Sequence, residues 1–264
     1  MLARTALALT LVAAGAQAQL GGLTDGLSSS CQSSALSLLT SSDFATCADL
    51  GGLLPVFTAS GSVVAPINSW LSSLCTSGTN CTESDINNAT AIIDQGCSAE
   101  VQAGQPSVTS IRAVVAGFPT VKQGLCLAST SNSSFCVTNL LNDIQNATGT
   151  DISVSTLSNL NASSLSSVSA GTVCTDCSHA LVSTWSPLFG NNESTITGAI
   201  TSECGSSFND GQVPSTVSEK TSANSSSGNG VESSNLNGAG SVALGGWKAA
   251  GAALLGAAGV VVLA

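Results

Sequence analysis

The chain has 264 residues, a net charge of −10 at pH 7 and only 8% charged residues. Five basic residues against fifteen acidic ones exclude nucleic acid as a partner, because phosphate binding needs clustered lysine and arginine. The same shortage excludes attraction of a basic patch to an anionic membrane surface. Solubility must therefore come from serine, threonine, asparagine and attached sugar.

The N-terminus has the pattern of a removable export signal. Arg4 precedes an apolar run from Ala6 to Ala14, and Ala16 and Ala18 form an A-x-A cleavage site before Gln19. We therefore expect residues 1–18 to be a signal peptide, and the mature chain to be extracellular.

Ten cysteines follow, an even number, and all of them lie in the mature region. Because the compartment is oxidising, we expect five disulfides, each contributing about 2–4 kcal/mol to the free energy of unfolding. The connectivity stays open, since ten cysteines allow hundreds of pairings. The cysteines expected to be bonded are Cys31, Cys47, Cys75, Cys81, Cys97, Cys126, Cys136, Cys174, Cys177 and Cys204.

Residues 19–210 are predicted to form an all-α domain stapled by these disulfides, because apolar residues recur at spacings of three and four. Thr82 is expected to cap a helix with Asp85, and Phe118-Pro119 to end another. The clearest strand-like alternation is Ile152-Ser153-Val154. The expected apolar helix faces run from Val63 to Leu74 (with the helix beginning near Ala65), Ile86 to Cys97, Val108 to Val115, Val137 to Ile144, Cys177 to Leu188 and Ile196 to Cys204.

Seven N-x-S/T sequons mark sites for N-linked sugar in an exported protein. Asn80 is the exception, because the middle residue of its sequon, Cys81, is expected in a disulfide. We expect glycans at Asn88, Asn132, Asn146, Asn161, Asn192 and Asn224.

The residues with catalytic chemistry are few. His179 is the sole histidine, and no G-x-S-x-G motif accompanies it. Cys174-x-x-Cys177 lacks a second ligand pair for zinc, so we expect both cysteines to be bonded to distant partners. The carboxylate pairs Asp43/Asp49 and Glu83/Asp85 are better explained as helix caps and solvated faces. We therefore predict no catalytic, cofactor or metal site.

After Cys204 the composition changes. Residues 211–237 are rich in serine, glycine and asparagine and are predicted to be a flexible stalk. Small residues at 237–239, a short spacer and an apolar terminus then form a signal for a glycosylphosphatidylinositol (GPI) anchor, with attachment at Asn237 and removal of residues 238–264. The alternative, a membrane span, has only 16 residues after Lys248, against roughly 20 needed to cross a bilayer.

Short blocks around the cysteines carry a resemblance to a known family. They include Trp70-Leu71-Ser72-Ser73-Leu74-Cys75, Phe118-Pro119-Thr120-Val121 and Cys174-Thr175-Asp176-Cys177. Over about residues 30–212 the chain resembles secreted, usually GPI-anchored, cysteine-rich proteins of basidiomycete fungi, catalogued only as a domain of unknown function. The resemblance implies location and architecture, and no activity.

The order of the first six cysteines, with a short gap between Cys75 and Cys81, is similar to that of the oomycete elicitins, helical proteins that carry a sterol in an apolar cavity. This resemblance implies the bonds Cys31–Cys97, Cys47–Cys81 and Cys75–Cys126. The first interval is shorter than in elicitins, and four cysteines have no counterpart there.

Two functions therefore stay open, with an acidic hydrolase a distant third. The first is a non-enzymatic, GPI-anchored glycoprotein of the cell surface or cell wall, held to the membrane by its lipid. The second is an elicitin-like module that binds sterol or lipid. Cell-wall glycan and sterol or lipid are the partner classes that the sequence leaves open.

Overall fold

Helices make up nearly all the regular structure of the computed structural model, which describes residues 26–77, 79–158, 168–188 and 203–221. Within these ranges the all-α prediction is confirmed, because the sole sheet has two strands of three residues each. The elements are α2 (Ser29–Ser41), α3 (Asp43–Cys47), η1 (Leu50–Leu53), α4 (Leu54–Thr58), α5 (Val64–Thr76), α6 (Glu83–Gly96), α7 (Ser98–Gln102), α8 (Pro106–Ala116), α9 (Phe118–Leu125), β1 (Leu127–Ser129), α10 (Cys136–Thr148), α11 (Val154–Ser158), α13 (Ala170–Val173), α14 (Asp176–Trp185), η3 (Ser206–Asn209) and β2 (Val217–Glu219).

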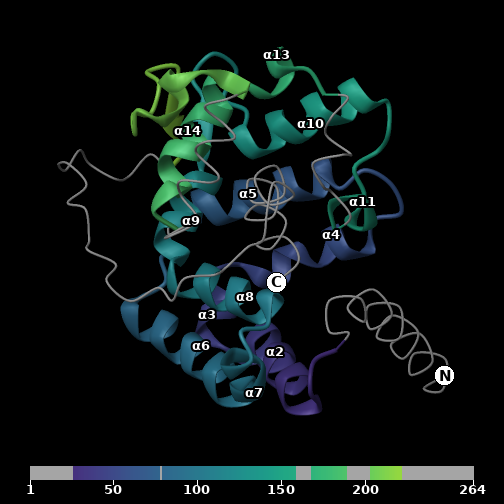
Figure 1. Ribbon diagram of the computed structural model, residues 1–264, viewed down its shortest axis with the longest axis vertical. Coiled ribbons are helices and arrows are strands. Elements are labelled where there is room, and N and C mark those ends of the chain that lie inside the picture. Colours follow the sequence, from purple (N-terminus) through teal and green to yellow (C-terminus); the bar gives the residue numbers. More distant parts are fainter. Residues whose placement is uncertain (1–25, 78, 159–167, 189–202, 222–264) are drawn as a thin grey trace.

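Helix α5 lies at the middle of the fold (Figure 1), with the early helices on one side and the late helices on the other. On the early side, α2 packs against α6, and α6 packs against α8. On the late side, α10 packs against α14, which also contacts α9 and the β1–β2 sheet. Helix α5 contacts both sides, because η1 packs against it from one direction and α10 from the other.

Polar caps set where several helices begin. The capping box of α6 is present as predicted: the Thr82 hydroxyl accepts the backbone N–H of Asp85 at 3.2 Å, and the Asp85 carboxylate accepts that of Thr82 at 2.8 Å. Ser42 caps α3 in the simpler way, accepting the N–H of Ala45 at 2.9 Å.

The helix that carries the Val108–Val115 face ends directly before Phe118-Pro119, as predicted, but the same two residues also begin a further helix that was not expected. Gly117 is the C-terminal cap of α8, and Phe118 is the first residue of α9, with Pro119 in its first turn. Proline fits there because the first N–H groups of a helix have no partner within the helix, so its missing N–H costs nothing.

The strand-like segment Ile152-Ser153-Val154 is not a strand. Val154 is the first residue of α11, while Ile152 is buried and its carbonyl accepts the backbone N–H of Val63 at 2.8 Å. Ile152 enters the core and Val154 packs against its edge, so the alternation marks two apolar contacts and not a strand. The sheet is instead formed by β1 and β2, which pair antiparallel with Leu127 opposite Glu219.

The predicted boundary between domain and stalk at residue 210 is too early. Beyond it, β2 pairs with β1 and buries Val217. Lys220 then donates its backbone N–H to the carbonyl of Cys126 at 2.8 Å. The folded domain thus includes residues 211–221, which were expected to be stalk.

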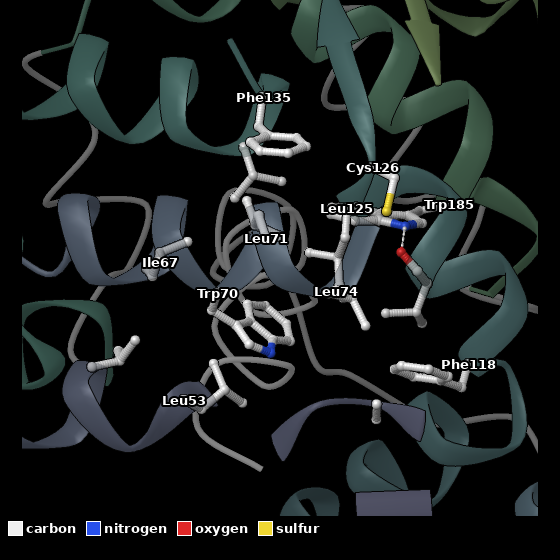
Figure 2. Close-up of a cluster of buried hydrophobic side chains, with 14 of the residues drawn as sticks. Leu53, Ile67, Trp70, Leu71, Leu74, Phe118, Leu125, Cys126, Phe135 and Trp185 are labelled. Carbon is white, nitrogen blue, oxygen red and sulfur yellow. Dashed lines mark hydrogen bonds between the residues drawn. The ribbon is translucent and has the colours of Figure 1, made fainter. Parts of the chain in front are cut away.

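The core is a continuous cluster of buried side chains centred on α5, the helix whose apolar face was predicted. Figure 2 shows Leu71 pointing from α5 toward Phe135, and Trp70 pointing the other way toward Leu53. Both buried tryptophan indoles of the described chain donate to backbone carbonyls: Trp70 to Asp49 at 2.9 Å and Trp185 to Val121 at 3.3 Å. Each ring thereby fills the core without leaving its N–H unpaired.

All ten cysteines are paired, which confirms the five predicted disulfides. Three of the pairs, Cys31–Cys97, Cys47–Cys81 and Cys75–Cys126, are those implied by the resemblance to elicitins. The other two, Cys136–Cys177 and Cys174–Cys204, hold the late helices and the C-terminal segment together.

Candidate functional site

The N-terminal end of α14 gathers the residues with the most reactive chemistry in the described chain. Thr175 caps the helix by accepting the N–H of Ser178 at 3.2 Å. The cap places Cys174 just before the helix, Cys177 in its first turn and His179 two residues after Cys177. The residues of the C-X-X-C motif and the histidine therefore lie at one end of a single helix.

The two cysteines of this motif belong to different disulfides. Cys177 is bonded to Cys136 of α10, and Cys174 is bonded to Cys204. Neither sulfur is a free thiolate that could attack a substrate or bind zinc. The prediction that both cysteines have distant partners is confirmed.

His179 is tied to the segment that follows η3. Its Nε2 lies 2.8 Å from Oδ1 of Asp210, and its ring stacks on Phe208 with 4.9 Å between the centroids. The backbone N–H of Gln212 and the imidazole both hydrogen-bond the Asp210 carboxylate, and together they hold its pKa below the ordinary aspartate value. The pair resembles the base and orienting acid of a triad, yet its described contacts hold a chain segment in place and include no nucleophile.

The four carboxylates considered for acid–base chemistry lie at helix starts or in a backbone turn. Asp85 completes the capping box, Glu83 lies in the same first turn of α6, and Asp43 lies in the first turn of α3. Asp49 adopts a left-handed conformation (φ 50°) and its carbonyl accepts the indole N–H of Trp70. Their positions match the expectation of helix caps and solvated faces.

A buried carboxylate that the sequence did not single out is Glu100 of α7. One of its oxygens accepts the backbone N–H of Ser28 at 2.7 Å, at the start of α2. The other oxygen is buried with no hydrogen-bond partner. The bond from Ser28 lowers the pKa of Glu100. Nothing in the local sequence distinguishes this glutamate, because its partner lies 72 residues away.

Aromatic side chains offer no stacking surface within the described ranges. Sugar-binding clefts commonly expose such rings, whereas the aromatic residues here are all buried, most of them in the central core. They are Phe44, Phe57, Trp70, Phe118, Phe135, Trp185 and Phe208.

All three basic residues between positions 26 and 221 are engaged by acceptors or rings of the chain itself. Arg112 forms a two-pronged pair with Asp94, joining α8 to α6. Lys122 bonds the carbonyl of Thr79 and the side chain of Asn80, and Lys220 bonds the carbonyl of Ser133 while lying over the Phe135 ring. The exposed acidic residues are therefore left largely without positive neighbours.

Four of the seven sequon asparagines are described, and all four are exposed: Asn80, Asn88, Asn132 and Asn146. The side chain of Asn132 accepts hydrogen bonds from both the N–H and the hydroxyl of Ser134, the third residue of its sequon. Asn161, Asn192, Asn224 and the predicted attachment residue Asn237 lie outside the described residues. The predicted signal peptide, the apolar tail and the expected face at Ile196 and Ile200 lie outside them too.

The described residues contain no group of three or more histidine, cysteine, aspartate or glutamate side chains placed to hold a metal ion. Within the same ranges, no helix combines the length and hydrophobicity that a membrane crossing requires.

A family model described as a domain of unknown function (DUF7729) matches residues 22–213. The chain belongs to this family. The matched region contains all ten cysteines and the elements from α2 to η3, so the DUF7729 domain corresponds to the stapled helical fold. Strand β2 lies just beyond the match. No curated protein and no solved structure matches the chain.

Proposed function

We propose that this DUF7729 protein is a non-enzymatic glycoprotein of the cell surface or cell wall, held to the outer leaflet of the plasma membrane by a GPI anchor. The observation that carries the proposal is the pairing of all ten cysteines in a domain that lies between a predicted export signal and an apolar terminus. Five disulfides persist in an oxidising, extracellular environment and are rare in the cytosol.

The surface of the domain supports this proposal. The exposed asparagines Asn88, Asn132 and Asn146 leave room for glycans on α6, on the loop after β1 and on α10. Because the described basic residues are engaged internally, the exposed charge is mostly negative. These features, room for glycans, an acidic surface and five disulfides, are typical of a domain exposed outside the cell.

The proposal of a non-enzymatic role is supported by what the reactive residues already do. His179 holds the C-terminal segment through Asp210, and Cys174 and Cys177 are consumed in structural bonds. The carboxylates that lie near each other in the sequence are found at helix starts and in a backbone turn, as expected of helix caps and solvated faces.

Metabolic labelling tests the anchor. We expect the full chain, expressed in a eukaryotic host, to incorporate radiolabelled ethanolamine and to fractionate with membranes or wall. A control chain that ends at Asn237 should be secreted without label, because it lacks the removed apolar tail. Membrane retention of the full chain without ethanolamine would instead establish a membrane span, and free secretion of the full chain would exclude any anchor.

The second candidate is an elicitin-like carrier of sterol or lipid. The specific observation in its favour is the bonding of the first six cysteines in the order that the elicitin resemblance implies. Against it, the apolar face of α5 is filled by Phe135 on one side and by Leu53 on the other (Figure 2). Native mass spectrometry of the deglycosylated protein after exposure to sterols and fatty acids separates the two: one retained lipid per chain supports the carrier, and an apo mass excludes it.

A further inference from the structure

The last described part of the chain, residues 203–221, folds back over α14 and β1; we call it the C-terminal clasp. Its covalent connection across the fold is the disulfide from Cys204 to Cys174, just before α14. The clasp therefore links the helical core to whatever follows residue 221.

This disulfide differs from the other four in exposure. Both Cys174 and Cys204 are partly exposed to solvent, whereas each of the other bonds has at least one buried cysteine. In the neighbouring bond of the same motif, Cys136 is fully buried and Cys177 is 7% exposed. A thiolate must reach a sulfur atom to break a disulfide, so Cys174–Cys204 offers the easiest approach.

The other contacts between the clasp and α14 are mainly polar and near solvent. Asp210 bonds His179, the carbonyl of Gln212 accepts from the hydroxyl of Ser183 at 3.0 Å, and Thr216 bonds Asp176 at 2.6 Å. Hydrogen bonds in such surroundings contribute little net stability, since water replaces them when they open. The apolar attachments of the clasp are Phe208 and Val217, each buried to more than nine-tenths.

We propose that Cys174–Cys204 is a redox latch, which a small dithiol opens before the other four bonds and which loosens the clasp from α14 without unfolding the core. The thiolate of the dithiol attacks one sulfur of the bond and forms a mixed disulfide, and the other cysteine leaves as a thiolate. The second thiol of the reagent then displaces the bound cysteine, so the dithiol is oxidised to a cyclic disulfide and the protein gains two thiols.

If the proposed anchor follows the clasp, the latch bears the mechanical load between the domain and the membrane; this part rests on the proposed function. Tension from the membrane would then enter the fold at residue 221 and peel β2 from β1. With the bond closed, Cys204 keeps the clasp tethered beside α14, so a separated β2 pairs with β1 again. With the bond open, this tether is lost, so β2 stays separated for longer and the clasp leaves α14.

Limited reduction of the whole secreted protein tests the order of opening and does not depend on the anchor. The native protein is treated briefly with dithiothreitol, quenched in acid, alkylated with N-ethylmaleimide and mapped by peptide mass spectrometry. We expect the first reduced species to carry label on Cys174 and Cys204, about tenfold ahead of any other pair. First labelling of another pair, or simultaneous opening of all five, would overturn the proposal.

Hydrogen exchange on a variant with both Cys174→Ser and Cys204→Ser tests what the latch holds. The amide of Lys220, which bonds the carbonyl of Cys126, should lose protection, while amides of α5 and α10 keep theirs. Unchanged protection at Lys220, or an equal loss in α5, would contradict the proposal. If this variant is not secreted, the same exchange experiment on the partly reduced native protein gives the answer.

Discussion

Trp185 of α14 lies directly on Gly124 of α9. A β-carbon built at Gly124 would be 2.1 Å from the indole Nε1 and 2.4 Å from the neighbouring ring carbon. The Trp185 ring is fully buried, and its N–H donates to the carbonyl of Val121, which lies in α9 like Gly124. The contact between α9 and α14, the last long helix among the described residues, therefore depends on the absence of a side chain at this position.

We expect Gly124→Ala to lower the free energy of unfolding by about 2–3 kcal/mol, because the indole cannot move away without disturbing a filled core. The matched control is Gly51→Ala, where an added β-carbon would have no atom within 4 Å. Urea unfolding of both variants, monitored by tryptophan fluorescence, measures the difference. Equal stabilities would show that the α9–α14 contact is loosely packed.

A second prediction concerns the extent of the domain. A secreted chain ending at residue 212 lacks β2, and with it the buried Val217 and the Lys220 side chain over Phe135. Its free energy of unfolding should be about 2 kcal/mol lower than that of a chain ending at residue 221, mainly because burial of the valine is lost. If thermal and urea unfolding of the two chains coincide, β2 contributes nothing and the domain ends where the stalk was first expected.

Glu100 should make stability depend on pH. Its pKa is lowered from the ordinary value of 4.5, mainly by the hydrogen bond from Ser28. A carboxylate with a lowered folded-state pKa stabilises the fold above its unfolded-state pKa, and this stabilisation is lost as the pH falls below about 4.5. Glu100→Gln should therefore be less stable than the parent near neutral pH, and the difference should shrink toward pH 3. A difference that stays constant across this range would mean that the Glu100 charge is not what holds Ser28.

The structure also predicts which sequons carry sugar. Asn88, Asn132 and Asn146 should be occupied, because each side chain is exposed. Asn80 should carry no glycan, for two reasons. Cys81, the middle residue of its sequon, is bonded to Cys47, and the side-chain oxygen of Asn80 accepts a hydrogen bond from Lys122. Enzymatic deglycosylation in heavy-oxygen water followed by peptide mapping reports each site separately. A glycan at Asn80 would show that sugar is added before Cys47 and Cys81 pair.

The sequence predicted what depends on neighbouring residues. The spacing of Ile67, Trp70 and Leu74 gave the buried face of α5, and Thr82 with Asp85 gave the start of α6, because both patterns lie within one or two helical turns. Residues of the C-X-X-C motif were correctly expected to be bonded to distant partners.

Contacts between distant residues escaped prediction. The strands β1 and β2 are three residues long and pair Leu127 with Glu219, so neither strand carries a recognisable alternation of its own. The same holds for Glu100 and Ser28, whose contact exists only because α7 folds back to the start of α2. The start of α9 was missed because Pro119 was interpreted only as the end of the preceding helix, whereas proline also marks helix starts.

The proposed GPI anchor requires that the apolar tail is removed and that a lipid is attached to the new C-terminus. The most direct measurement is the mass of the C-terminal peptide of the protein isolated from membranes or wall. We predict a peptide that ends at Asn237 and carries ethanolamine phosphate with glycan attached. A peptide that continues through Ala264 would contradict the account and establish the tail as part of the mature protein.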